Sequence, residues 1–303
     1  MIFCSFLFPV FAPGNNLLGT IYNLYKFFAF NFYFTIASDN TSMTNIFTRK
    51  ELKYRITKDQ EKALLARLQD SLKPDVYFDY RVYSIYYDSA NLDLMTRCHP
   101  GSAYKEKVRL RSYIPNPKGD DPIFLELKKK IDGVCVKRRK TLQAKDLDQA
   151  LMPTQGGIVD ADLKRIEKNL PDLAGRFFLS AHRNCYVWKD DEDLRITFDD
   201  ALYWREKALT LDLNPTLDRP LIGKDEVILE IKCASNLPLK LVRILDELDI
   251  VPDSFSKAGA VFARLIQEGA LTYGYDNSHS NSRCRSVGTS CRRSWRPVCE
   301  NQL

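Results

Sequence analysis

Six short segments of this chain alternate charged and apolar residues, and this alternation constrains the fold more than any other feature. In residues 49–56 the odd positions are Arg, Glu, Lys and Arg, whereas Leu52, Tyr54 and Ile56 fall between them. Successive side chains of a strand point to opposite faces of its sheet, so each segment predicts a strand with one charged face. The other segments are residues 104–111, 123–131, 134–141, 194–199 and 227–233.

The charged faces are mainly cationic. Residues 104–111 carry Lys or Arg at every odd position, and residues 123–131 and 134–141 each place cations two positions apart. Like charges directly opposite each other destabilise a sheet, so a solvated face should mix signs. A face that binds a polyanion explains this excess of cations better than a solvated face does. Because the opposite faces are apolar and need covering, we expect an α+β fold, an antiparallel β-barrel tunnel with a charged lumen and helices packed outside.

Helical periodicity appears between and after the predicted strands. Residues 57–72 begin with Thr57 and have Gln60 three positions later, which is a capping-box pattern. Residues 146–151, 160–170, 237–248 and 256–268 also predict helices. The chain has 45% hydrophobic residues and a net charge of only +6, so the placement of its cations matters more than their number. Asp132-Gly133, between two predicted strands, indicates a hairpin turn.

Residues 1–42 differ in composition from the rest of the chain. They are rich in Phe, Tyr, Leu and Asn, and Lys26 and Asp39 are their only charged residues. Residues 17–37 are about long enough to span a bilayer, but Lys26 lies in the middle of that stretch. A signal peptide would begin with positive charge, which is absent. We favour translation from Met43, with a membrane anchor and a cleaved signal as the alternatives.

The other end of the chain, residues 271–303, is rich in Ser and Arg without an apolar period, which predicts disorder. We therefore expect one folded domain over residues 43–270. We expect the protein in the cytoplasm, with membrane association as the alternative.

The residue types of the charged faces suit phosphate and a metal ion. Arg and Lys both bind phosphate. Glu51, Glu126 and Glu230 recur among the cations, either as ligands of a hard divalent cation or as partners of neighbouring lysines. The sequence has no Walker A motif and no plausible Ser/His/Asp set. Any phosphate chemistry must therefore rest on positioning and charge, which phosphoryl transfer permits.

The ordered set of these segments resembles the VTC (vacuolar transporter chaperone) polyphosphate polymerase domain, in a stand-alone bacterial-type form. The resemblance covers about residues 45–267. It is carried by residues 49–54 (RKELKY), 82–88 (VYSIYYD), 108–113 (VRLRSY), 124–128 (FLELK), 132–134 (DGV), 137–139 (KRR), 195–199 (RITFD), 229–232 (LEIK) and 254–257 (SFSK).

The resemblance implies a fold and a reaction. The family belongs to the CYTH-like triphosphate tunnel metalloenzymes, which implies an antiparallel tunnel of about eight strands. It implies transfer of the γ-phosphoryl group of ATP to a growing polyphosphate chain, with Mn²⁺ or Mg²⁺ as cofactor. ATP and polyphosphate would be the ligands, and a membrane protein is a further candidate partner.

Position by position, the resemblance implies three groups of site residues. The catalytic residues are Arg109, Arg111, Lys128 and Lys257. The residues that hold the phosphate chain are Lys53, Lys137, Arg183, Arg195 and Lys232. The metal ligand is Glu230, with Glu51 and Glu126 as helpers. Lys257 lies near the start of the last predicted helix, whose N-terminus would help to hold a terminal phosphate, and we expect Ser256 to cap that helix.

Two alternatives remain. The first predicted strand carries Glu51-x-Lys53 rather than the Glu-x-Glu-x-Lys of CYTH-type relatives, which disfavours a plain triphosphatase. A hydrolase in the same tunnel, with Glu51 or Glu126 orienting water, is nevertheless the first alternative. The second is a polyanion-binding module without catalysis. Nucleic acid is not expected, because Tyr54, Phe124 and Phe198 lie opposite the cations or singly, not interleaved with them.

Overall fold

All six charged segments form strands in the computed structural model, which describes residues 50–98, 102–131, 134–149, 158–234 and 236–269. The strands are β1 (Lys50–Thr57), β2 (Leu72–Asp88), β3 (Tyr104–Ser112), β4 (Pro122–Ile131), β5 (Val134–Gln143), β6 (Ala174–Trp188), β7 (Asp191–Arg205), β8 (Arg219–Pro220) and β9 (Glu226–Cys233). The helices are α2 (Lys58–Leu68), α3 (Asp93–Thr96), α4 (Ile158–Asn169), α5 (Leu239–Glu247) and α6 (Lys257–Gln267), with a 3-10 helix η1 (Ala144–Gln149).

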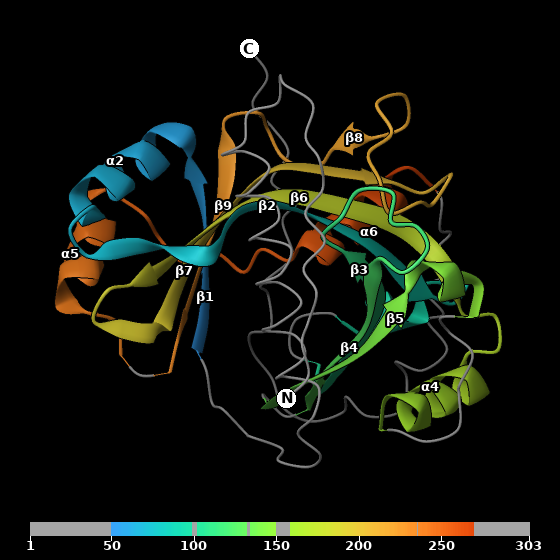
Figure 1. Cartoon of the computed structure of the whole chain (residues 1–303). Helices are drawn as coiled ribbons and strands as arrows, with labels where there is room; N and C mark the ends of the chain where they lie inside the picture. The colour runs from blue at the N-terminus through green and yellow to red at the C-terminus, as the bar shows by residue number, and fades with distance from the viewer. Residues whose placement is uncertain (1–49, 99–101, 132–133, 150–157, 235, 270–303) are drawn as a thin grey trace, which may run out of the picture. The chain divides into compact units, whose positions relative to one another are not determined.

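The strands form one antiparallel sheet in the order β1-β9-β7-β6-β2-β3-β4-β5, and β8 pairs with β7. The long strands β2 and β6 lie in the middle of this strongly curved sheet (Figure 1). The α+β class and the antiparallel pairing are therefore confirmed.

The prediction of a closed barrel is wrong for the described residues, because β1 and β5 do not pair and the sheet stays open between them. A local reason lies at the outer edge of β1. The backbone N–H of Asp253 donates to the carbonyl of Lys53 at 2.7 Å, and Tyr54 forms an isolated bridge with Pro252. The connection between α5 and α6 thus occupies backbone groups that a closing strand would need.

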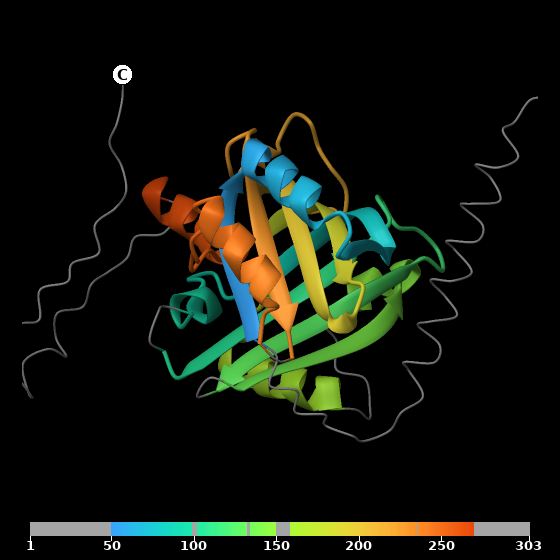
Figure 2. The same cartoon turned by 90° about the vertical axis from the view of Figure 1, so that its left-hand side faces the viewer.

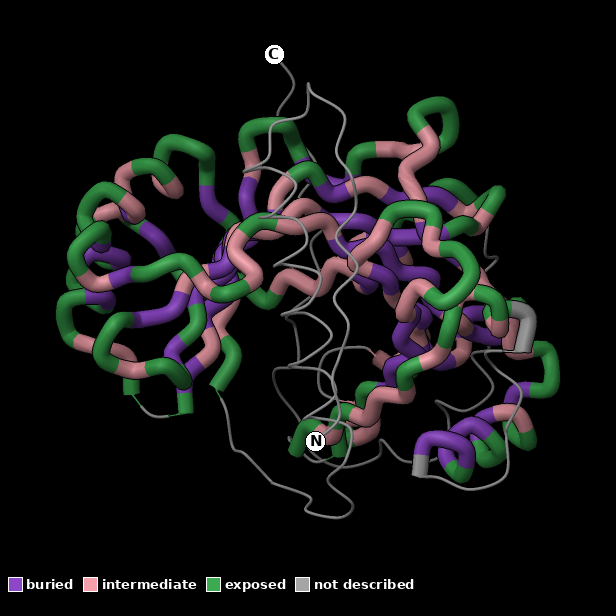
Figure 3. The backbone as a smooth tube through the Cα atoms, in the orientation of Figure 1, coloured by how far each residue is buried: buried purple, intermediate pink, exposed green. Residues whose placement is uncertain are grey.

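The helices cover both faces of the sheet. Helices α2 and α5 pack on β1, β9 and β7 (Figure 2), with Leu64, Leu229 and Leu241 in their shared core. Helix α4 contributes Leu163 to a second core with Val108 on β3. Helix α6 packs on the opposite face of the sheet, in a third apolar core that includes residues of β2, β6, β7 and β9. Buried segments accordingly run along the middle of the strands (Figure 3).

Most predicted helices are also confirmed. Thr57 Oγ1 accepts from the N–H of Gln60 at 3.1 Å, and Gln60 Oε1 accepts from the N–H of Thr57 at 3.0 Å, which completes the predicted capping box. The segment predicted as a helix from residue 146 is the 3-10 helix η1 instead. The short helix α3 and strand β8 were not predicted, because neither is long enough to show a period.

Several predictions lie outside the described residues: those for residues 1–42 and 271–303, and the turn at Asp132-Gly133. Strands β4 and β5 on either side of that turn do pair antiparallel. No helix in the described part of the chain is long and apolar enough to cross a membrane.

Candidate functional site

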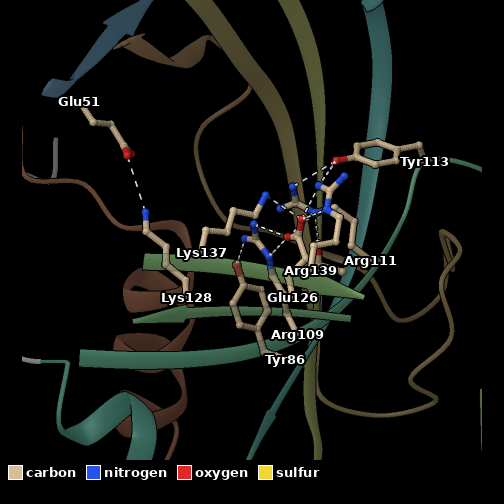
Figure 4. Close-up of polar contacts among 10 residues, drawn as sticks. Glu51, Tyr86, Arg109, Arg111, Tyr113, Glu126, Lys128, Lys137 and Arg139 are labelled. Atoms are coloured by element: carbon tan, nitrogen blue, oxygen red, sulfur yellow. Dashed lines mark hydrogen bonds and ion pairs between the residues drawn. The ribbon is translucent and has the colours of Figure 1, made fainter. Parts of the chain in front are cut away.

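Curvature of the sheet brings side chains of distant strands together on one face. Lys128 Nζ on β4 lies 3.7 Å from Glu51 Oε2 on β1, although the two strands are far apart in the strand order (Figure 4). We call the face that carries both residues the inner face. Residues directly opposite each other on neighbouring strands share a face, so the register assigns the remaining site residues.

The register places every predicted strand residue of the site on the inner face. Glu51, Lys232 and Arg195 lie opposite one another on β1, β9 and β7. Arg183 on β6 lies opposite Asp199 on β7, which alternates with Arg195. The remaining residues occupy alternate positions of their strands: Lys53 on β1, Glu230 on β9, Arg109 and Arg111 on β3, Glu126 and Lys128 on β4, and Lys137 on β5.

Four cations converge on the buried carboxylate of Glu126, whose side chain is 1% exposed (Figure 4). Arg109 Nε donates to Glu126 Oε2 at 2.7 Å, Arg139 Nε donates to Oε1 at 2.8 Å, and Lys137 Nζ lies 2.8 Å from Oε1. Arg111 Nε is 3.6 Å from Oε2. One carboxylate therefore holds three guanidinium groups and an ammonium group in place.

The electrostatics of this cluster are strongly perturbed. Burial alone would raise the pKa of Glu126, but Arg109, Arg111 and Lys137 hold it far below its usual range. Burial lowers the pKa of Lys137 to about 8, although Glu126 opposes the shift. A single carboxylate cannot balance the surrounding cations, and the imbalance favours binding of a further anion.

Two tyrosines complete the cluster. Tyr86 Oη accepts from Arg109 Nη1 at 3.0 Å, and Tyr113 Oη accepts from Arg139 Nη2 at 3.2 Å. Burial would raise both phenol pKa values, but the neighbouring cations, Arg109 first for Tyr86 and Arg111 first for Tyr113, lower each to about 8.

A second group of charges lies on β1 and β9. Lys53 is opposite Glu230 in register, and its Nζ is 3.1 Å from Glu51 Oε1. Lys232 Nζ lies 2.6 Å from Glu230 Oε1. Burial opposes ionisation of Glu230, but Lys232 and then Lys257 hold its pKa well below the usual range. Burial also opposes the charge of Lys53, yet Glu230 and Glu51 raise its pKa.

Helix α6 brings Lys257 to the inner face. Its Nζ lies 2.5 Å from Asp199 Oδ2, and Arg183 donates to both oxygens of the same carboxylate, at 2.5 and 2.7 Å. Asp199 is fully buried, which would raise its pKa, but Lys257 and Arg183 lower it to about 2. Arg183 is therefore a largely buried partner of Asp199 and not a solvated surface charge.

The start of α6 is also joined to the sheet by a cation. Ser256 Oγ accepts from the N–H of Gly259 at 3.2 Å, which confirms the predicted cap. The same oxygen accepts from Lys107 Nζ on β3 at 3.2 Å. Lys107 lies directly opposite Lys128, which lies opposite Lys137. Three lysines thus form a cross-strand row that ends beside the N-terminus of α6, where backbone N–H groups favour anions.

Glu51 and Glu230 are two of the carboxylates that were predicted to hold a divalent cation. They lie on the inner face of neighbouring strands, and Lys53 lies between them. Mg²⁺ is commonly held by one or two carboxylates together with phosphate oxygens, and two carboxylates on neighbouring strands supply ligands of that type. In the described ranges, no three or more His, Cys, Asp and Glu residues gather into a metal site. Glu126 is already surrounded by cations. The roles of Glu230, Glu51 and Glu126 as metal ligands stay predictions.

Sequence reasoning did not select five residues that take part in this arrangement: Tyr86, Lys107, Tyr113, Arg139 and Asp199. Lys107 and Arg139 follow the same alternation as the chosen cations, so the signal was present. Tyr86 and Asp199 gave no such signal, because their importance comes from Arg109 and from Lys257, far away in the sequence.

Comparison with known proteins places the chain in a family. A model of the VTC domain matches residues 48–265. No curated protein sequence matches the chain.

Among solved structures, an adenylate cyclase-like protein from Bacillus halodurans shares 14% identity, with a TM-score of 0.45 over 69% of this chain and 95% of its own. A Hippeastrum adenylyl cyclase with a dominant triphosphatase activity shares 16% identity, with a TM-score of 0.40 over 74% of this chain and 97% of its own. At TM-scores below 0.5, neither supports an inference about this chain.

Proposed function

Because this chain belongs to the VTC domain family, we propose that it is a polyphosphate polymerase. It transfers the γ-phosphoryl group of ATP to the end of a growing polyphosphate chain and releases ADP. The observation that carries the proposal is the charge of the inner face. Cations outnumber carboxylates there across the whole sheet, from the edge strand β1 to the edge strand β5. Such a face matches a ligand that carries negative charge along its whole length.

The catalytic contribution of this face is electrostatic. Arg109, Arg111 and Lys128 lie on neighbouring strands and stabilise the negative charge of the transferring phosphoryl group. Glu126 fixes both guanidinium groups before the substrate arrives, so little reorganisation is needed during the reaction. The acceptor is itself a phosphate anion, so it has no proton to lose and needs no general base.

Lys257 and the N-terminus of α6 hold the phosphate at the end of the chain. Asp199 fixes the ammonium group of Lys257, and Lys107 extends the cationic surface from β3 to the same helix end. The more distant phosphates are held by further cations of the inner face, among them Lys53, Lys137, Arg183, Arg195 and Lys232.

A divalent Mn²⁺ or Mg²⁺ ion is part of the proposal. Glu230 and Glu51 would hold it, because these two carboxylates lie diagonally across neighbouring strands among cations that we expect to bind phosphate. When bound, it would neutralise charge on the triphosphate oxygens.

The proposal is tested with the full-length chain, ATP and Mn²⁺. Products are resolved on gels for polyphosphate and assayed separately for ADP and free phosphate. We expect polymer together with an equal amount of ADP, and Lys257→Met should lower the rate by roughly 10²-fold. The matched control is Lys240→Met, because Lys240 is exposed on α5 and bonds only to Ser71 among the described residues.

Either of two results would contradict the proposal and favour another function. Free phosphate without polymer indicates a hydrolase in the same site. Binding of polyphosphate without consumption of ATP indicates a binding module.

A further inference from the structure

A continuous row of side chains crosses the inner face from the apolar core under α6 to the edge strand β5. Its members lie directly opposite one another on successive strands: Phe177, Tyr86, Arg109, Glu126 and Arg139. The rings of Phe177 and Tyr86 stack with centroids 4.8 Å apart and planes 13° apart. Tyr86 Oη then accepts from Arg109, Arg109 donates to Glu126, and Glu126 accepts from Arg139.

Tyr86 is the member that joins the apolar part of this row to its charged part. Its ring is buried with Phe177 and with Val261 of α6, whereas its hydroxyl meets the guanidinium of Arg109. The guanidinium carbon also lies 5.8 Å from the centre of the Tyr86 ring. A phenylalanine would keep the stacking but would lose the polar contact.

The contacts of Arg109 show that the Tyr86 hydroxyl helps to fix the orientation of its guanidinium group. A guanidinium has five N–H donors in a planar fork. Nε donates to Glu126 Oε2 at 2.7 Å, Nη2 lies 2.7 Å from the same oxygen, and Nη1 donates to Tyr86 at 3.0 Å. The guanidinium is therefore held from two sides, by β4 and by β2. Its remaining N–H groups are on the terminal nitrogens, where they can bind phosphate oxygens in bidentate fashion.

We propose that Tyr86 is a positioning residue for phosphoryl transfer, which fixes the guanidinium of Arg109 so that its terminal N–H groups meet the phosphate chain. The inference rests on the proposed function, because it requires Arg109 to bind the triphosphate. Glu126 alone would leave the guanidinium held along one side only, and rotation about that contact would misplace the donors.

The electrostatic surroundings of Tyr86 supply an additional readout. The charged groups that act on its phenol are Arg109, Lys107 and Arg111 of β3, and the phenol in turn acts on Lys53 of β1. Burial would raise the pKa of Tyr86, but the β3 cations lower it to about 8. A bound phosphate chain offsets those cations and disfavours the phenolate, so phenol ionisation above pH 8 opposes phosphate binding.

The test compares Tyr86→Phe with Tyr87→Phe in the full-length chain. Tyr87 is the next residue along β2 and packs against the opposite core, so the two variants make the same chemical change on opposite faces. We expect Tyr86→Phe to lower kcat/KM for polymer synthesis roughly ten- to hundredfold, the range for a hydrogen bond to a charged group. Tyr87→Phe should leave it unchanged, and both variants should remain folded at the assay temperature.

A double-mutant cycle then shows whether Tyr86 acts through Arg109. If it does, Tyr86→Phe combined with Arg109→Lys should be no slower than Arg109→Lys alone. Calorimetric binding of tripolyphosphate supplies the pH readout. As pH rises above 8, affinity should fall less in Tyr86→Phe than in Tyr87→Phe, since other titrating groups, such as Lys137, are common to both.

Additive effects in the cycle, or equal activities of the Tyr86 and Tyr87 variants, would overturn the inference while leaving the polymerase assignment intact. A parent protein that neither binds tripolyphosphate nor makes polymer would overturn both.

Discussion

Replacing Glu126 by Gln should destabilise the protein, because Glu126 is the buried counter-ion of a cationic cluster. The substitution keeps the shape of the side chain and removes its charge from Arg109, Arg139 and Lys137, each of which approaches it within 2.8 Å. Removing one partner of a buried ion pair costs about 3–5 kcal/mol. The cations keep some contact with solvent, with 21–45% of their side chains exposed, so we expect about 3 kcal/mol.

For a domain of this size, that loss lowers the thermal midpoint by roughly 6–12 °C, which circular dichroism at pH 7 measures. The control is Glu247→Gln, whose carboxylate is 60% exposed and pairs with Arg67, and which should cost about 1 kcal/mol or less. Tripolyphosphate should recover more stability in Glu126→Gln than in the parent, because the ligand takes the place of the missing negative charge. Equal midpoints for the two variants would refute the assignment of Glu126 as the counter-ion of this cluster.

Two further predictions follow from the lowered pKa values. The pKa of Asp199 is about 2 in the fold, so its stabilisation is complete above the unfolded value of about 3.9 and is lost as pH falls through 2. Urea titrations should therefore show a stability loss of about 2 kcal/mol between pH 4 and 2 that Asp199→Asn lacks; parallel curves would contradict it. Lys137, with a pKa of about 8, loses its charge above that pH. Tripolyphosphate affinity should fall there in the parent and fall less in Lys137→Arg, since Arg stays protonated while Tyr86 still ionises in both proteins; identical pH profiles would count against a role for Lys137.

The sequence was informative where one strand carries the signal by itself. Alternation alone identified the charged strands and the residues that share a face within each strand, such as Arg109 with Arg111, because the two-residue period of a strand leaves little freedom. That Lys128 and Lys137 lie on the same face as Arg109 comes from the register of the strands. The capping box at Thr57 was also predicted correctly, because it depends only on Thr57 and on Gln60 three residues later.

Features that depend on long-range contacts could not be read from the sequence. The barrel was predicted closed, but Pro252 and Asp253 occupy the edge of β1, and nothing in their sequence indicates that position. The same limit applies to Asp199, which becomes a site residue only when α6 brings Lys257 to it. Tyr86 looks like any other strand tyrosine until Arg109 lies opposite it.

The most direct test of the central claim is the fate of the γ-phosphoryl group. The full-length chain is supplied with Mn²⁺ and ATP labelled at the γ-phosphorus, and the label is partitioned between polymer and orthophosphate while ADP is counted. The account predicts that the label enters the polymer in amounts equal to ADP, and that Lys257→Met lowers both together. Label found in orthophosphate, with none in polymer, would show that water is the acceptor and would contradict the account.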